Sequence, residues 1–428
     1  MKWHLRGGRV LDPEAGLDAR ADLWIAEGRI VAVGSPPADF TPDRTLSLDG
    51  LLVLPGLVDL SARLREPGLE HKATIASELP AAAGGGITTL VCPPDTLPVV
   101  DSPAQIEHIQ RNAAAVAGPR VEVLAALTPG LRGEGLSEMA ALRAAGCIGL
   151  SNGLRPLANT LILRRALEYA DTVGLAVHLH PIDPYLSAGG CAHEGAVATR
   201  LGLPGIPPAA ETAALAQILA LVEQTGARVH LCRLSTERGV RLVAQARRDG
   251  LPVTADVAMH QLLLTEADLE GFDTHCHVLP PLRTERDRRA LVEAVATGEI
   301  QAICSDHQPH DADAKNAPFP QTEPGASALD TLLALGLQLA ARGELELDTV
   351  VARLTTGPAR VLGIERGTLQ VGHPADLCVV DLHRVWTVAP ETLRSQGKNT
   401  PFLGRRMQGA VVHTWVDGRL VHSLETGD

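Results

Sequence analysis

The chain has 428 residues, of which 45% are apolar and 21% charged, a balance that supports a large folded core and excludes a disordered chain. Its formal net charge is −12 and 2% of its residues are aromatic, so we expect no nucleic acid as a partner. No run of about 18 uncharged apolar residues is present, so we expect no membrane span. The seven cysteines form no C-x-x-C pair, which suits reduced thiols in a cytoplasmic protein.

The two ends of the chain share one pattern. Residues 1–55 consist of short alternating segments broken by Gly, Pro and Asp, which is typical of strands and hairpins without helices. Residues 366–428 repeat this style, with strand-like runs at 375–380 and 411–416. We therefore predict one small β-sandwich domain formed by both termini, residues 1–55 together with 358–428.

The middle of the chain alternates apolar runs with helical stretches, as expected for parallel strands covered on both faces. The predicted strands are 57–60, 87–92, 121–127, 147–151, 175–180, 228–233, 253–257 and 302–306. The predicted helices are 73–83, 103–117, 137–145, 159–174, 209–226, 236–249, 285–298 and 327–342. This strict alternation predicts an α/β fold, a (β/α)₈ TIM-type barrel over residues 56–357.

Functional residues of such a barrel lie where its strands end at their carboxyl side. Polar segments follow most of the predicted strands, at 59–68, 92–96, 151–153, 178–181, 230–236 and 305–310. These segments therefore hold the candidate site residues.

Six sequence pieces resemble the amidohydrolase superfamily and, within it, the type I dihydroorotases. They are 64–68 (LREPG), 98–101 (PVVD), 234–236 (LST), 280–283 (PPLR), 306–310 (DHQPH) and 372–376 (GHPAD). The resemblance runs through almost the whole chain. It implies the amidohydrolase architecture of a barrel beside a two-ended β-sandwich, hydrolysis of a cyclic amide, and a zinc centre at the strand ends.

The resemblance also implies six zinc-ligand positions: an H-x-H after the first strand, an Asp after the fourth, a His ending each of the fifth and sixth, and an Asp ending the eighth. At these positions the chain carries Ser61, Arg63, Asn152, His180, Arg233 and Asp306. Zinc needs three or four nitrogen, sulfur or carboxylate donors, and a guanidinium has no free lone pair. We therefore expect no metal, no cofactor and no metal-assisted hydrolysis, with Asp306 as the one residual catalytic-type residue.

The positions that contact substrate in the family are mixed. Arg65 matches its carboxylate-binding arginine, and His310 matches its ring-contacting histidine. Asp95 and Leu279 stand where the family has asparagines, and an acid at position 95 would repel an anion. One alternative function is therefore a non-hydrolysing binder of an orotate-like anion that uses Arg65 and His310.

A closer resemblance is to a subgroup of bacterial dihydroorotase-like chains that lack the zinc ligands and associate with aspartate carbamoyltransferase. The stretches 202–207, 307–319 and 401–404 carry this closer similarity. It implies a catalytically silent pseudoenzyme of pyrimidine biosynthesis. Such a chain acts as an assembly subunit for the catalytic chain of the transferase, in a cytoplasmic hetero-oligomer.

A second alternative is an active cyclic amidohydrolase of dihydroorotase, hydantoinase or allantoinase type with one relocated zinc. His178 and His180 share a strand face and, with Asp306, could hold that ion. His230 alternates with the neighbouring Arg position, so we expect it to point outward toward a helix.

Two further hypotheses concern charges at the barrel mouth. Arg63 and Arg233 could face Asp306, so that guanidinium charge replaces a dication and keeps this carboxylate ionised. Alternatively, Asp306 could act with Asp95 and Glu66 in metal-free acid–base hydrolysis.

Overall fold

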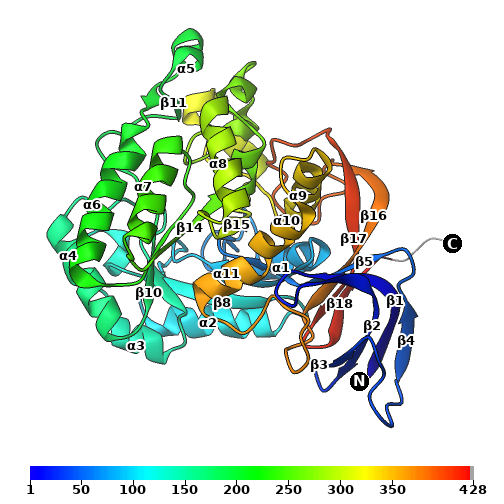
Figure 1. Ribbon diagram of the computed structural model, residues 1–428. Helices are drawn as coiled ribbons and strands as arrows, with labels where there is room; N and C mark the ends of the chain where they lie inside the picture. The colour runs from blue at the N-terminus through cyan, green and yellow to red at the C-terminus, as the bar shows by residue number, and fades with distance from the viewer. Residues whose placement is uncertain (425–428) are drawn as a thin grey trace.

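The computed structural model describes residues 1–424, which form a parallel barrel with a β-rich lobe beside it (Figure 1). Eight parallel strands follow one another around the barrel in chain order. They are β6 (Leu57–Asp59), β7 (Ile87–Cys92), β8 (Arg120–Ala126), β9 (Gly149–Ser151), β10 (Ala176–Leu179), β13 (Val229–Leu231), β14 (Val253–Ala258) and β15 (Ala302–Cys304). Each lies within about two residues of a predicted strand, so the predicted barrel is confirmed.

The barrel closes just beyond the ends of its first and last strands. β6 and β15 share no ladder, but Ala62 and His307 form a parallel bridge at the mouth. There the His307 backbone N–H donates to the Ser61 carbonyl at 3.0 Å, and its carbonyl accepts from the Arg63 N–H at 3.0 Å. Below this seam the buried Asp59 carboxylate accepts from the Ser305 N–H at 2.8 Å. The segments that carry several candidate residues therefore also complete the barrel.

Helices surround the strands, as expected from the alternating pattern (Figure 1). The predicted eight correspond to α1 (Ile75–Gly84), α2 (Pro103–Ala114), α3 (Met139–Ala144), α4 (Thr160–Thr172), α6 (Ala209–Thr225), α7 (Glu237–Arg248), α8 (Glu285–Thr297) and α9 (Leu332–Ala341). Threonine side chains fix several starts: Thr74 and Thr284 form capping boxes at α1 and α8, and Thr236 caps α7.

Several short elements were not predicted from the sequence. They are α5 (Ala196–Leu201), α10 (Leu347–Leu354), α11 (Thr356–Leu362), β11 (Ala192–His193), β12 (Gly205–Ile206) and the 3₁₀ turns η1 (Pro129–Leu131), η2 (Met259–Leu262), η3 (Glu266–Leu269), η4 (Thr274–Cys276), η5 (Ala312–Lys315) and η6 (Phe319–Gln321). In α11, Gly357 and Pro358 mask the helical pattern, yet the helix packs on β6 and β15. α5 and β11 project from the barrel (Figure 1).

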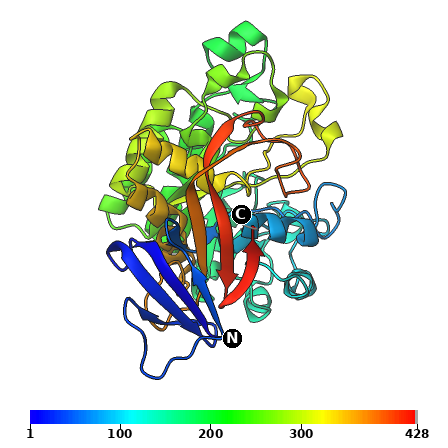
Figure 2. The same ribbon diagram turned by 90° about the vertical axis from the view of Figure 1, so that its right-hand side faces the viewer.

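Strands from both ends of the chain form one eight-stranded sheet, in the order β18-β17-β16-β5-β1-β2-β3 with β4 also paired to β1. They are β1 (Trp3–Asp12), β2 (Leu17–Ala26), β3 (Arg29–Val33), β4 (Arg44–Ser47), β5 (Leu52–Pro55), β16 (Leu377–Thr387), β17 (Arg406–Val416) and β18 (Arg419–Ser423). The pairing of β1 with β2 has a register shift between Leu5 and Gly8. Residues 3–6 of β1 pair with β4, whereas residues 9 and 10 pair with β5. The sheet therefore bends around its own hydrophobic core. Figure 2 shows the N-terminal strands beside the C-terminal ones.

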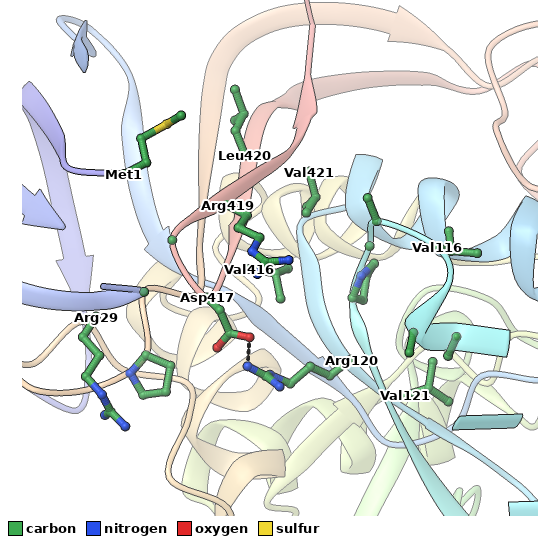
Figure 3. Close-up of a pocket in the computed structure, with 18 of the residues that line it drawn as sticks. Met1, Arg29, Val116, Arg120, Val121, Val416, Asp417, Arg419, Leu420 and Val421 are labelled. Atoms are coloured by element: carbon green, nitrogen blue, oxygen red, sulfur yellow. Dashed lines mark ion pairs between the residues drawn. The ribbon is translucent and has the colours of Figure 1, made fainter. Parts of the chain in front are cut away.

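A groove of about 1450 Å³ separates this sheet from the barrel near the N-terminus (Figure 3). Arg120, the first residue of β8, forms an ion pair with Asp417 in the turn between β17 and β18. The Asp417 N–H also donates to the Asp376 carboxylate at 2.7 Å. The C-terminal turn is thereby attached to the base of the barrel.

The state of the cysteines and the length and polarity of the helices bear on two expectations from the sequence. All seven cysteines are buried and unpaired, as expected of small apolar residues. Within residues 1–424, no helix is long and apolar enough to cross a membrane.

The packing of the two ends generates a stability prediction. Trp415 is 0% exposed and meets Trp3 edge-on, with ring centroids 5.6 Å apart. We expect Trp415→Ala to lower the free energy of unfolding by about 3–5 kcal/mol, because it leaves a large cavity. The measurement is denaturant unfolding, with Val385→Ala, which removes a 45% exposed side chain, as the matched control. A cost for Trp415→Ala no larger than that of the control would contradict this account of the core.

Candidate functional site

Asp306, just after β15, is the centre of a charged network at the barrel mouth. Its Oδ1 lies 3.3 Å from Arg63 Nη1 and 3.6 Å from Arg233 Nε, and it accepts a 3.3 Å hydrogen bond from Ser61 Oγ. Its Oδ2 accepts from Gln308 Nε2 at 3.0 Å. Asp306 is 1% exposed, so protein groups replace water around this carboxylate. The expected pairing of both arginines with Asp306 is therefore present.

Arg63 binds a second carboxylate. Its Nε donates to Asp95 Oδ2 at 2.7 Å. Burial opposes ionisation of Asp95, but the charge and hydrogen bond of Arg63 outweigh it and lower the pKa of this carboxyl. Glu66 instead accepts from the Ile75 N–H at 2.9 Å, at the start of α1. One guanidinium thus bridges Asp95 and Asp306. Glu66 is engaged elsewhere, so the structure does not bring the three carboxyl groups together as an acid–base site.

Backbone conformation helps to aim these side chains. Arg65, Arg233 and Asp306 have φ values of 61°, 58° and 45°, in the left-handed region that side-chain-bearing residues seldom adopt. Side chains alternate between the two faces of a strand, but a residue with left-handed backbone just beyond the strand interrupts this alternation. Arg233 therefore reaches Ser61 and Asp306, with its Nη1 3.3 Å from Ser61 Oγ.

Charge balance keeps Arg233 protonated. Burial alone would lower the pKa of its guanidinium, yet the nearby Asp306 carboxylate and its neighbours raise it above the usual value. Arg233 is 5% exposed. Its guanidinium is therefore a permanent buried cation with no lone pair to offer a metal.

Asn152 and His180 lie outside the Asp306 network. Asn152 Oδ1 accepts from Thr128 Oγ1 at 2.8 Å, and its Nδ2 donates to the Arg155 carbonyl at 2.9 Å. His180 Nδ1 donates to the Cys232 carbonyl at 3.3 Å, while its buried Nε2 has no partner among residues 1–424. Burial lowers the pKa of His180 to about 3, so the ring is neutral. Asn152 and His180 both line a separate cavity of about 260 Å³.

These residues do not fit a zinc centre of the family type. Of the six positions, Arg63 and Arg233 carry cations that would repel zinc. Both amide atoms of Asn152 are hydrogen-bonded, to Thr128 after β8 and to Arg155 in its own loop, and Ser61 donates its proton to Asp306. Too few free donors remain for the three or four that zinc requires.

The relocated zinc set of His178, His180 and Asp306 is not brought together either. Among the described residues, one group of three ligand-type side chains has its donor atoms within 4.8 Å of one another, namely His178, His230 and Cys232. We call this group the histidine–cysteine trio. It shares one member with the expected set.

The expected outward direction of His230 is wrong. The β10–β13 register pairs it with His178, and the β13–β14 register pairs it with Thr254, so these side chains share a face. His230 is 2% exposed and lies 2.9 Å from Asp256 Oδ2 through its Nε2. The outward direction follows only if side chains keep alternating from His230 to Arg233, and the left-handed backbone at Arg233 breaks that alternation.

The two matched substrate-contact residues lie next to each other. His310 Nδ1 accepts from Lys72 Nζ at 3.3 Å, and its Nε2 donates to the Pro324 carbonyl at 3.0 Å. Arg65 Nε donates to the Pro309 carbonyl at 3.0 Å, and its Nη2 lies 3.3 Å from the His310 ring. Burial, together with the cations Arg65 and Lys72, lowers the pKa of His310 to about 2, so this ring is neutral.

Arg65 retains the capacity to attract an anion. It is 8% exposed, and no ion pair joins it to a carboxylate among residues 1–424. Burial and the like charge of Arg63 lower the pKa of Arg65 to about 10, so it stays protonated at neutral pH.

Supporting residues that the sequence analysis missed hold the mouth loops. Glu211, buried on α6, accepts from Ser235 Oγ at 2.6 Å and Thr236 Oγ1 at 2.5 Å, which fixes the loop after β13. His307 Nε2 lies 2.9 Å from Glu78 Oε2 on α1, and both residues are 0% exposed. In the sequence, Glu211 and Glu78 each interrupt an otherwise apolar helix face, and this pattern could have identified both as buried acids with a structural role.

Comparisons with known proteins agree with this architecture. A family model described as "Dihydro-orotase-like" matches residues 50–239. The chain is 50% identical to the "Dihydroorotase-like protein" of Pseudomonas putida, over 98% of this chain and 99% of that protein. It is 52% identical to the protein of the same description from Pseudomonas aeruginosa, over 98% and 99%. It is also 41% identical to a "Dihydroorotase" of Geobacter sp. (strain M21), over 98% of each chain.

Solved structures extend the similarity in fold. The L-hydantoinase (dihydropyrimidinase) from Arthrobacter aurescens superposes with a TM-score of 0.87 at 25% identity, over 98% of this chain and 96% of that one. A dihydropyrimidinase from Brevibacillus agri gives 0.85 at 22% identity, over 99% and 95%, which shows the shared fold. The resemblance inferred from six sequence pieces is confirmed at the level of the family. This chain belongs to the dihydroorotase-like family of amidohydrolases.

Proposed function

We propose that this protein is a dihydroorotase-like chain that does not hydrolyse cyclic amides and that serves as an assembly subunit for aspartate carbamoyltransferase. The observation that carries the first part is the pairing of Arg63 and Arg233 with Asp306 at family metal positions. The partner is proposed from the sequence resemblance of 202–207, 307–319 and 401–404 to the transferase-associated subgroup.

Physical chemistry explains why the pairing supports loss of hydrolysis. A metal in such a barrel lowers the pKa of a bound water and polarises the amide carbonyl. A guanidinium supplies positive charge but cannot accept a lone pair from water, so it generates no hydroxide nucleophile. Arg63 and Arg233 thus supply charge at the mouth but cannot activate water as a metal would.

The same pairing supports a structural role. Arg63 follows β6 and Asp306 follows β15, so their contact ties the first barrel strand to the last at the closing seam. Two guanidinium groups on one buried carboxylate keep the loops in place without an ion. An ordered mouth is what a scaffold needs, whether or not it catalyses a reaction.

The first prediction from this proposal concerns the stability of the barrel mouth. We expect Arg233→Ala to lower the free energy of unfolding by about 3–5 kcal/mol, because it weakens the compensation of a buried carboxylate. Adding Asp306→Asn to that variant should recover part of the loss, which a double-mutant cycle measures. Arg165→Ala, at a side chain 58% exposed, is the control. Equal unfolding energies for wild type and Arg233→Ala would refute the charge replacement.

The second prediction concerns hydrolysis. We expect the purified chain to leave dihydroorotate intact with or without added zinc, while an active dihydroorotase run in parallel hydrolyses it. Zinc-dependent turnover by this chain would disprove the proposal. Orotate is also tested as a ligand in thermal melts. Stabilisation that is absent in Arg65→Ala would favour the anion-binding alternative over a pure scaffold.

The third prediction concerns assembly. We expect co-expression with aspartate carbamoyltransferase from the same organism to give one co-eluting complex on size-exclusion chromatography with light scattering. The transferase expressed alone should be smaller or less active, because it lacks its assembly subunit. A transferase that reaches the same size and activity alone, and does not co-elute with this chain, would count decisively against the role.

A further inference from the structure

The histidine–cysteine trio lies inside the barrel, deeper than the mouth network. His178 is on β10, His230 is on β13, and Cys232 follows β13 directly. Their donor atoms lie within 4.8 Å of one another, and the three residues are 2%, 2% and 6% exposed. We propose that the trio binds one divalent transition-metal ion, of the zinc class, as a buried structural site. This proposal goes beyond the assembly role and does not depend on it.

The donor set favours this class of ion. Two imidazoles and one thiolate are ligands that zinc and cobalt(II) accept and that magnesium and calcium do not. Zinc bonds of about 2.0–2.3 Å place tetrahedral ligands roughly 3.5 Å apart. The donor atoms of the trio lie within 4.8 Å of one another, so the side chains would move toward each other on binding.

His230 already has the outer contacts of a metal ligand. Its Nε2 lies 2.9 Å from Asp256 Oδ2, and a carboxylate accepts, so Nε2 carries the proton. Its Nδ1 is therefore the unprotonated nitrogen, and its lone pair accepts from Thr254 Oγ1 at 2.8 Å, so an ion binds there only after the Thr254 side chain rotates about χ1. Asp256 is fixed in turn by the Arg233 N–H at 2.5 Å. A carboxylate behind an imidazole is the usual second contact of metal-bound histidine.

His178 is the second imidazole of the trio. Its ring centroid lies 5.1 Å from that of His230, and its side chain forms no hydrogen bond with any of residues 1–424. Buried polar groups normally find a partner. A bound ion would supply the one that His178 lacks.

Charge also balances at this site. Binding displaces the Cys232 thiol proton to solvent, and the resulting thiolate cancels one of the two charges of the ion. Asp256 lies next to His230 and supplies the second negative charge. The guanidinium of Arg233 is directed to Asp306 and Ser61, so it does not take this role. The fourth metal position is left to water, and the burial of the trio gives a cyclic amide no access to it.

The test uses the full chain, stripped of metal with a chelator and titrated with cobalt(II). We expect one cobalt per chain with a thiolate-to-cobalt charge-transfer band, and displacement of cobalt by zinc. Cys232→Ala should abolish the band, and His178→Asn should weaken binding at least tenfold, roughly the smallest effect seen for altered metal contacts. Cys147→Ala, which removes a buried thiol outside the trio, is the matched control and should keep the band.

Two results would overturn the proposal: no thiolate band in the wild-type chain at saturating cobalt, or a band that persists in Cys232→Ala. Circular dichroism establishes whether each variant is folded. If Cys232→Ala does not fold, His178→Asn decides alone, and unchanged cobalt affinity in that variant refutes the site. A bound ion without dihydroorotate turnover leaves the proposed non-hydrolysing role intact.

Discussion

The buried carboxylate of Asp306, held between two guanidinium groups, is the interaction on which the barrel mouth depends. The first and last barrel strands share no ladder, so the seam between them relies on contacts just beyond their ends. A charge-assisted contact in a dry site is strong only while both signs are present. Under the proposed function, the two guanidinium groups supply positive charge beside Asp306 where the resemblance implies a metal.

Similarity at this level assigns a family more firmly than a reaction. Relatives at 50–52% identity are described as dihydroorotase-like proteins, and one at 41% as a dihydroorotase. Hydantoinases share the whole architecture. One fold supports several chemistries because function resides in a few side chains at the strand ends. This chain has Arg63 and Arg233 at two such positions, and their pairing with Asp306 is the basis of the proposed role.

Much of the fold could be predicted from the sequence because long apolar runs and helical periodicity are local signals. The strands 87–92 and 253–257 are clear examples, since each lies within a residue of its observed counterpart. The short helix α11 could not be predicted in the same way, because Gly357 and Pro358 obscure its pattern. The site was predictable where residues matched a motif, as at Arg63 and Asp306. The trio was not, because the register that pairs His178 with His230 is a tertiary property.

The sheet that joins both ends has a consequence for synthesis of the chain. The inner edge of β5, residues 52–55, pairs with residues 377–380, so it stays open until those distant residues have been made. An unpaired strand edge is a template for unwanted pairing, and a closing contact this distant in sequence forms late. A chain cut short anywhere in the barrel would keep that edge bare. Folding of the N-terminal strands into the complete sheet therefore waits for residues 377–380.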